Sequence, residues 1–132
     1  MIRKNGKLLL CLSLAITLLS FTTAFAVSGY YQVSLPWFKQ DVVVMSGSKV
    51  YNDDYVLNRV DYVGAQYDAA DFWVVRQDGS RISDNYACYE GQGTYTISFK
   101  TDERAGTFIM LYAQNHDITY VNVTLSGYAD LR

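Results

Sequence analysis

Two side chains in this sequence could support nucleophilic catalysis, namely the single histidine and the one cysteine that follows the N-terminal segment. His116 lies in the polar stretch AQNHD, and Cys88 lies in NYACYEG. A thiol nucleophile needs a base within hydrogen-bond reach and usually a third group that orients the base. Nothing in the sequence places His116 near Cys88, and Asp117 is only its neighbour along the chain. We expect no catalytic residues and interpret AQNHD as a turn between two strands.

Carboxylates are the other groups that could carry chemistry. The middle third of the chain holds Asp53, Asp54, Asp61, Asp68, Asp71, Asp78, Asp84 and Glu90. A glycoside hydrolase needs two carboxylates facing each other, and calcium needs oxygen ligands at a regular spacing. No stretch has that spacing, and there is no HExxH or CxxC motif for zinc. We therefore expect a solvated acidic rim with no metal site and no cofactor. A small extracellular hydrolase and a calcium-stabilised structural domain are the alternatives.

Aromatic residues are the remaining candidates for ligand contact. The mature part of the chain holds all 12 tyrosines and both tryptophans, and several lie beside turns, where a ring can stack on a sugar or anchor a protein interface. The candidate ligand-contact residues are Trp37, Trp73, Tyr86 and Tyr89. Strand packing is the competing explanation, because tyrosine is also favoured in strands.

The N-terminal segment has the pattern of a secretory signal peptide. Basic residues in MIRKNGK precede an apolar run from Leu8 to Phe21, and the small residues of AFA end at Ala26. This pattern predicts cleavage after residue 26 and a single mature domain over residues 27–132. The apolar run is short for a membrane span, so we expect a secreted, extracellular protein with no membrane span after cleavage.

The charge of the mature part limits its partners. Removing three basic residues from the 11, and none of the 13 acids, leaves 8 against 13 and a net charge of −5. A chain with this net negative charge lacks the excess of basic residues that attracts nucleic acid or anionic lipid. Cys88 cannot close an internal disulfide alone, although it could pair between chains, so the domain must be stabilised by its apolar core.

Alternation of apolar and polar residues predicts an all-β fold. In TYTISFK the apolar side chains recur at every second position, and TFIMLYA is apolar on both faces, as in a central strand. Similar runs are GYYQVSLPWF, KQDVVVM, YVLNRVDYV, DFWVVRQ and TYVNVTL, the last with Val121, Val123 and Leu125 on one face. Seven candidate strands separated by turn signals predict a single antiparallel β-sandwich of about seven strands.

The turn residues suggest how these strands connect. Asp78-Gly79 in RQDGSR is a dipeptide that tolerates positive φ, which predicts a tight turn after the DFWVVRQ strand. The polar stretch KTDERAG, residues 100–106, predicts a hairpin between TYTISFK and TFIMLYA. The AQNHD stretch predicts a second hairpin between TFIMLYA and the last strand.

From residue 72 to the C-terminus the sequence resembles small secreted Gram-positive bacterial proteins grouped as domain of unknown function 2712. The shared features are Phe72-Trp73, Arg81 and Ser83 before a glycine-containing stretch, an Ala-Gln-Asn segment at 113–115, and the ending LSGYAD at 125–130. Members have Asn where His116 stands, which favours the turn interpretation. The resemblance implies secretion and an all-β fold, and some such proteins resemble bacteriocin-like products. It implies no catalytic site.

Together these features predict a secreted, non-enzymatic β-sandwich that acts as a binding or cell-surface interaction module, with a bacteriocin-like role as one form of it. The expected partner is a cell-wall or protein surface ligand. An exposed aromatic patch would support this expectation, and a uniformly polar surface would argue against it.

Overall fold

The computed structural model describes residues 27–64 and 67–132, and the expected signal peptide lies outside these residues. They form eight strands: β1 (Ser28–Leu35), β2 (Val42–Ser48), β3 (Tyr55–Val63), β4 (Ala69–Arg76), β5 (Tyr86–Tyr89), β6 (Thr94–Ser98), β7 (Phe108–Asn115) and β8 (Val123–Asp130). Within the described ranges there is no helix of the length and apolarity that a membrane crossing requires.

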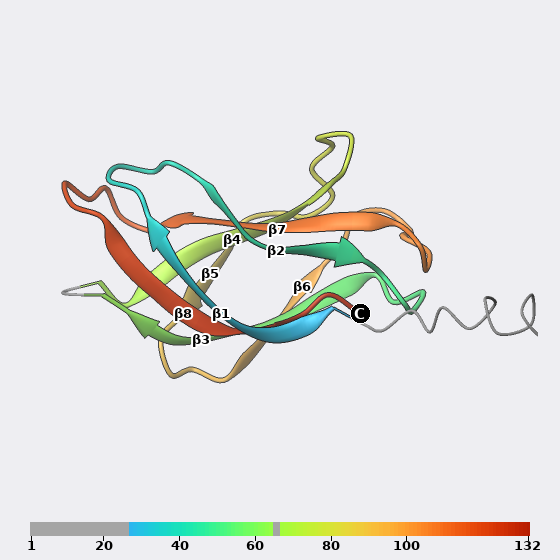
Figure 1. Cartoon of the computed structure of the whole chain (residues 1–132), viewed down its shortest axis with the longest axis horizontal. Helices are drawn as coiled ribbons and strands as arrows, with labels where there is room; N and C mark the ends of the chain where they lie inside the picture. Colours follow the sequence, from blue (N-terminus) through green and yellow to red (C-terminus); the bar gives the residue numbers. More distant parts are fainter. Residues whose placement is uncertain (1–26, 65–66) are drawn as a thin grey trace, which may run out of the picture.

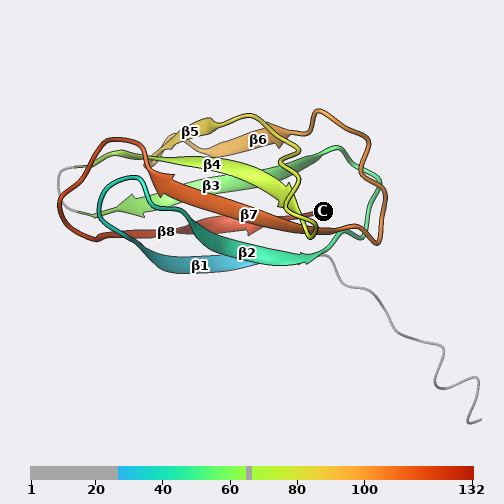
Figure 2. The same cartoon turned by 90° about the horizontal axis from the view of Figure 1, so that it is seen from above.

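The strands build two four-stranded antiparallel sheets that pack face to face, which confirms the expected β-sandwich (Figures 1 and 2). One sheet has the order β1-β8-β3-β6 and the other β2-β7-β4-β5. The sequence indicated about seven strands; the additional one is β5, a four-residue edge strand that pairs with β4. A strand this short carries too little alternation to stand out in the sequence.

Both predicted hairpins are wrong, and Ala113, Gln114 and Asn115 of AQNHD lie within β7. The 100–106 stretch joins β6 to β7, and the stretch after Asn115 joins β7 to β8, but each pair lies in different sheets. A hairpin-like turn signal does not specify whether the next strand pairs with the previous one or crosses the sandwich. β4 and β5 are the consecutive strands that pair directly, and Gly79, with φ 90°, lies in their connection.

The core contains the inward-facing side chains of both sheets. β4 shows how a central strand is covered, because seven of its eight residues are buried. β7 and β8 alternate regularly between buried and more exposed positions. Val123 and Leu125 are buried as predicted, whereas Val121 lies before β8 and is exposed. The predicted alternation is correct within β8 and is wrong only at Val121, which precedes the strand.

A buried tyrosine packs over a glycine in the middle of the first sheet. Tyr31 on β1 pairs with Gly127 on β8, which pairs on its other side with Val60 on β3. A Cβ atom on Gly127 would lie 2.0 Å from the Arg59 carbonyl oxygen and 2.6 Å from the Tyr31 hydroxyl. That hydroxyl donates a 3.0 Å hydrogen bond to Asn58 Oδ1. Gly127 thus leaves room for the Tyr31 ring and the neighbouring backbone.

Candidate ligand-binding surface

The outer face of the β1-β8-β3-β6 sheet carries a row of large polar and aromatic side chains. Strand pairing places Tyr30 opposite Tyr128, and Tyr128 opposite Arg59. Side chains opposite one another in an antiparallel pair are direct neighbours. Tyr30 is 78% exposed, and Arg59 is partly exposed. We call Tyr30, Tyr128, Arg59, Asp61 and Tyr62 the tyrosine–arginine row.

The Arg59 guanidinium is held in place from three sides. Its carbon lies 5.9 Å from the Tyr30 ring centroid and 5.7 Å from that of Tyr128, within the range of a cation–π contact. The two rings meet edge to face at 5.2 Å. Arg59 also donates Nε to Asp61 Oδ1 at 2.7 Å and Nη2 to Asp61 Oδ2 at 3.2 Å. An exposed arginine is therefore ordered before any ligand arrives.

The hydrogen bond from Arg59 lowers the pKa of the Asp61 carboxyl below its usual range. The hydrogen bonds to Asp61 raise the pKa of Arg59 above its usual range. Both groups are therefore charged at neutral pH. The pair is neutral as a unit and offers donors and acceptors side by side.

A β-bulge in β3 gives the row its carboxylate and its third tyrosine. The pairing of β3 with β8 shifts between Val60 and Tyr62, so that Asp61 and Tyr62 are both exposed before Val63 returns to the core. In a regular strand one of these two consecutive side chains would point inward. The bulge thus adds a residue to the outer face.

Smaller polar side chains surround the tyrosine–arginine row. Arg59 pairs with Thr94 on β6, and Tyr62 pairs with Ser126 on β8, which in turn pairs with Gln32 on β1. Gln32 and Thr94 are exposed, and Ser126 is partly exposed. Hydroxyl and amide groups both donate and accept hydrogen bonds. The face therefore places hydrogen-bonding groups beside exposed aromatic rings.

The four predicted ligand-contact aromatics do not form one surface. Trp37 lies exposed between β1 and β2. Trp73 is only 8% exposed on the outer face of the other sheet, stacked on Tyr112 at 5.8 Å. Tyr86 packs against the core, and Tyr89 is exposed at the end of β5. The tyrosine–arginine row is not evident in the sequence, because its members are brought together only by strand pairing.

His116 and Cys88 lie on different sides of their sheet. His116 follows β7, and its Nδ1 lies 2.6 Å from Oδ1 of Asp71 on β4, so its partner is Asp71 and not the adjacent Asp117. The Cys88 side chain is buried in the core. Burial, followed by the charge of Asp71, raises the pKa of the Cys88 thiol to about 12. A thiol with that pKa is a poor nucleophile at neutral pH, and pairing between chains would require it to be uncovered.

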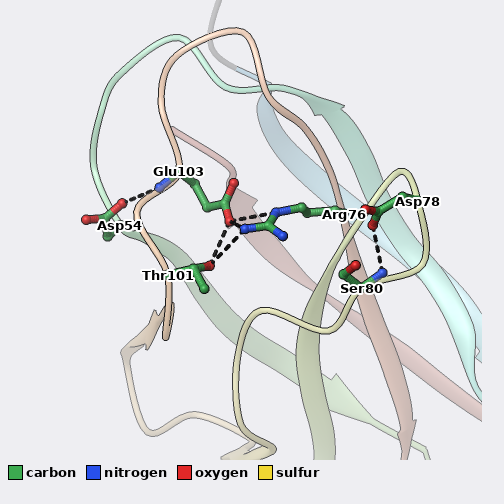
Figure 3. Close-up of polar contacts among 6 residues, drawn as sticks. All are labelled: Asp54, Arg76, Asp78, Ser80, Thr101 and Glu103. Carbon is green, nitrogen blue, oxygen red and sulfur yellow. Dashed lines mark hydrogen bonds and ion pairs between the residues drawn. The ribbon is translucent and has the colours of Figure 1, made fainter.

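Two acids of the middle third, Asp54 and Asp78, have structural partners near the end of the sandwich where the C-terminus lies. Asp54 accepts a 2.7 Å hydrogen bond from the Glu103 amide, and Glu103 accepts from Arg76 Nε at 2.8 Å and from the Thr101 hydroxyl at 2.7 Å (Figure 3). Asp78 accepts from the Ser80 amide and shapes the β4–β5 turn. The part of the chain that the structure describes holds no group of three or more metal-ligating side chains.

The Glu103 carboxylate gives this network a testable dependence on pH. Burial alone would raise the pKa of Glu103, but hydrogen bonds from Arg76 and Thr101 outweigh burial and lower the pKa below its ordinary 4.5. The stabilisation is present above pH 4.5 and is lost as pH falls through the depressed folded-state pKa. We expect Glu103→Gln to lower the free energy of unfolding by about 2 kcal/mol at pH 7.

Denaturation with urea between pH 7 and pH 3 tests this expectation. The difference in the free energy of unfolding between Glu103→Gln and the unsubstituted protein should become smaller below pH 4.5. Asp102→Asn, an exposed change on the same connection, is the matched control and should have little effect. A difference that stays constant down to pH 3 would contradict the assigned role of the carboxylate.

Comparisons with known proteins assign no family to this chain. No family model matches it, and no curated protein matches it. Among solved structures it is similar to a chain in a study titled "Structural and functional characterization of Pseudomonas aeruginosa AlgX", with 14% identity and a TM-score of 0.47. The match covers 83% of this chain and 28% of that chain.

Proposed function

We propose that this chain is a secreted, non-enzymatic binding module for neutral polysaccharide of the bacterial cell wall. The signal-peptide pattern supports secretion. The observation that carries the proposal is the tyrosine–arginine row, in which Arg59 is fixed by two tyrosine rings and Asp61 on an exposed sheet face.

The chemistry of a sugar matches this row. Each pyranose has hydroxyl groups that donate and accept hydrogen bonds, and a face of C–H bonds that packs on an aromatic ring. Two adjacent hydroxyl groups of a sugar need a hydrogen-bond donor and an acceptor side by side. The Arg59 guanidinium provides the donors, and the neighbouring Asp61 carboxylate provides the acceptors. Because Asp61 already neutralises Arg59, an anionic polymer gains little from this arginine. The ligand class is therefore a neutral glycan, and its binding should depend little on salt.

Removing one ring of the row should weaken binding to walls. We expect Tyr30→Ala to reduce affinity about fivefold to tenfold, because a lost aromatic contact is worth roughly 1 kcal/mol. The measurement is co-sedimentation of the secreted protein with purified Gram-positive walls from which anionic polymers have been removed. Growth inhibition scored with the same cells tests the bacteriocin-like role that the resemblance suggests.

Tyr120 provides a matched control, because it is also 78% exposed but lies outside the row. Tyr120→Ser should sediment with these walls like the unsubstituted protein. If Tyr30→Ala and Tyr120→Ser bind equally well, the row is not the contact surface. If the unsubstituted protein does not sediment at all, wall binding itself is wrong.

A further inference from the structure

A second exposed surface, chemically unlike the row, lies at one end of the sandwich. The β1–β2 and β7–β8 connections come together there, away from the C-terminus (Figures 1 and 2). Five exposed apolar side chains project from these two connections: Trp37, Phe38, Ile118, Tyr120 and Val121. We call them the aromatic tip.

The aromatic tip is held by a buried polar side chain. Asn115 Nδ2 lies 2.8 Å from the Pro36 carbonyl oxygen, 3.0 Å from that of Phe38 and 2.9 Å from the Thr119 hydroxyl. The Phe38 amide donates to the Thr119 carbonyl at 2.7 Å. Asn115 and Thr119 are both buried, and their hydrogen bonds join the two connections. These bonds fix the backbone from which the exposed side chains project.

Phe38 shows that the exposure is imposed by the fold. Its φ is 59°, in the left-handed region that non-glycine residues rarely occupy. Such a conformation costs of the order of 1 kcal/mol or more and persists only where surrounding contacts fix it. Here it keeps the ring between Trp37, at 4.6 Å, and Tyr120, at 5.8 Å. The strained backbone therefore displays an aromatic cluster at the surface.

The composition and charge of the tip indicate what it contacts. Tryptophan and tyrosine combine an apolar ring with a polar group and favour the boundary between lipid chains and water, while Ile118 and Val121 favour the apolar side of it. The fixed charges flanking these side chains are Lys39, Asp41 and Asp117, which give no excess of positive charge. Among the five side chains only Trp37 and Tyr120 carry a polar group, so the tip has few donors and acceptors for the hydroxyls of a sugar.

We infer that the aromatic tip docks into the interfacial layer of a lipid bilayer through apolar insertion, without requiring anionic headgroups. This inference does not depend on glycan binding by the row, which lies on a sheet face. All five side chains project from one end, so a single end-on contact can insert them together. Membrane surface attachment of this kind scales with apolar area and is only weakly affected by salt when charge contributes little.

Vesicle binding tests the inference directly. The secreted protein is mixed with phosphatidylcholine vesicles, and binding is followed by co-sedimentation and by the blue shift of tryptophan emission. Trp73 is buried, so the shift should come from Trp37 and disappear in Trp37→Phe. We expect binding to persist in 0.5 M NaCl. Ile118→Ser combined with Tyr120→Ser should weaken it at least tenfold. Tyr30→Ser, an equally exposed tyrosine on the row, should leave it unchanged.

Several results would overturn the inference. These are no binding to phosphatidylcholine, binding only to phosphatidylglycerol vesicles with loss in salt, equal losses for the tip and Tyr30 variants, or self-association through the tip in gel filtration. The substituted side chains are exposed, so melting temperatures should confirm that every variant folds. A protein that sediments with walls but not with vesicles would refute the bilayer contact alone and leave the proposed function standing.

Discussion

Replacing Gly127 with alanine is expected to lower the free energy of unfolding by at least about 3 kcal/mol. The new methyl group would lie 2.0 Å from the Arg59 carbonyl oxygen and 2.6 Å from the Tyr31 hydroxyl, so β3 must move away from β8 and the Tyr31 ring must also shift. Moving Tyr31 would also break its hydrogen bond to Asn58, whose side chain is fully buried. A buried amide without a partner adds its own desolvation cost. Urea denaturation measures the loss.

Gly29 gives a control within the same sheet. It lies on β1 opposite Ala129, and a Cβ atom there would have nothing within 4 Å. Gly29→Ala should therefore change the stability by only a few tenths of a kcal/mol, because it adds β-carbon without a clash. If both substitutions lowered the free energy of unfolding equally, the loss at Gly127 would reflect a general effect of replacing glycine in a strand. It would not reflect the packing of Tyr31 over Gly127.

The second large effect is expected for Arg59. Arg59→Ala should weaken binding to neutral wall polysaccharide about 30-fold, as for a central contact residue worth roughly 2 kcal/mol. The substitution removes the donors, and it also leaves the Tyr30 and Tyr128 rings without the group that they flank. Co-sedimentation with the walls described above measures the change.

Arg59→Lys separates charge from geometry. Lysine retains the positive charge, but it cannot donate two parallel hydrogen bonds to Asp61 or stack as a plane on the rings. We expect Arg59→Lys to bind almost as weakly as Arg59→Ala. If lysine restored most of the affinity, the site would recognise its ligand by charge, and the assignment to a neutral glycan would be contradicted. Both changes are on an exposed face, so their melting temperatures should stay near that of the unsubstituted protein.

The strands were predictable because their alternation is a local property of the sequence. Tyr95, Ile97 and the residues between them specify an inner and an outer face without reference to the rest of the chain. Sheet membership was not predictable in the same way, because a polar connection such as residues 100–106 can close a hairpin or cross the sandwich. The crossing depends on where the next strand pairs, a tertiary property: β7 lies between β2 and β4 in the other sheet.

Most of the candidate site could not be predicted from the sequence, because it also depends on tertiary structure. Tyr30, Arg59 and Tyr128 are neighbours only through the pairing of β1 and β3 with β8. The β3 bulge then places Asp61 and Tyr62 on the outer face, and no residue in YVLNRVDYV signals it. The sequence offers a different criterion, the position of an aromatic residue beside a turn. That criterion located Trp37 of the aromatic tip, but it also selected Trp73, which is buried under Arg81 and beside Tyr112.

The most direct test of the proposed function is an NMR titration of the ¹⁵N-labelled protein with glycan fragments released from walls by a muramidase. We expect the amide shifts that change to be those of the tyrosine–arginine row and the paired residues of β1, β8 and β3. The same titration in 0.5 M NaCl should change the shifts of the same amides. Changes confined to the aromatic tip or to the β2-β7-β4-β5 sheet, or no changes at millimolar glycan, would contradict a glycan-binding role for this face.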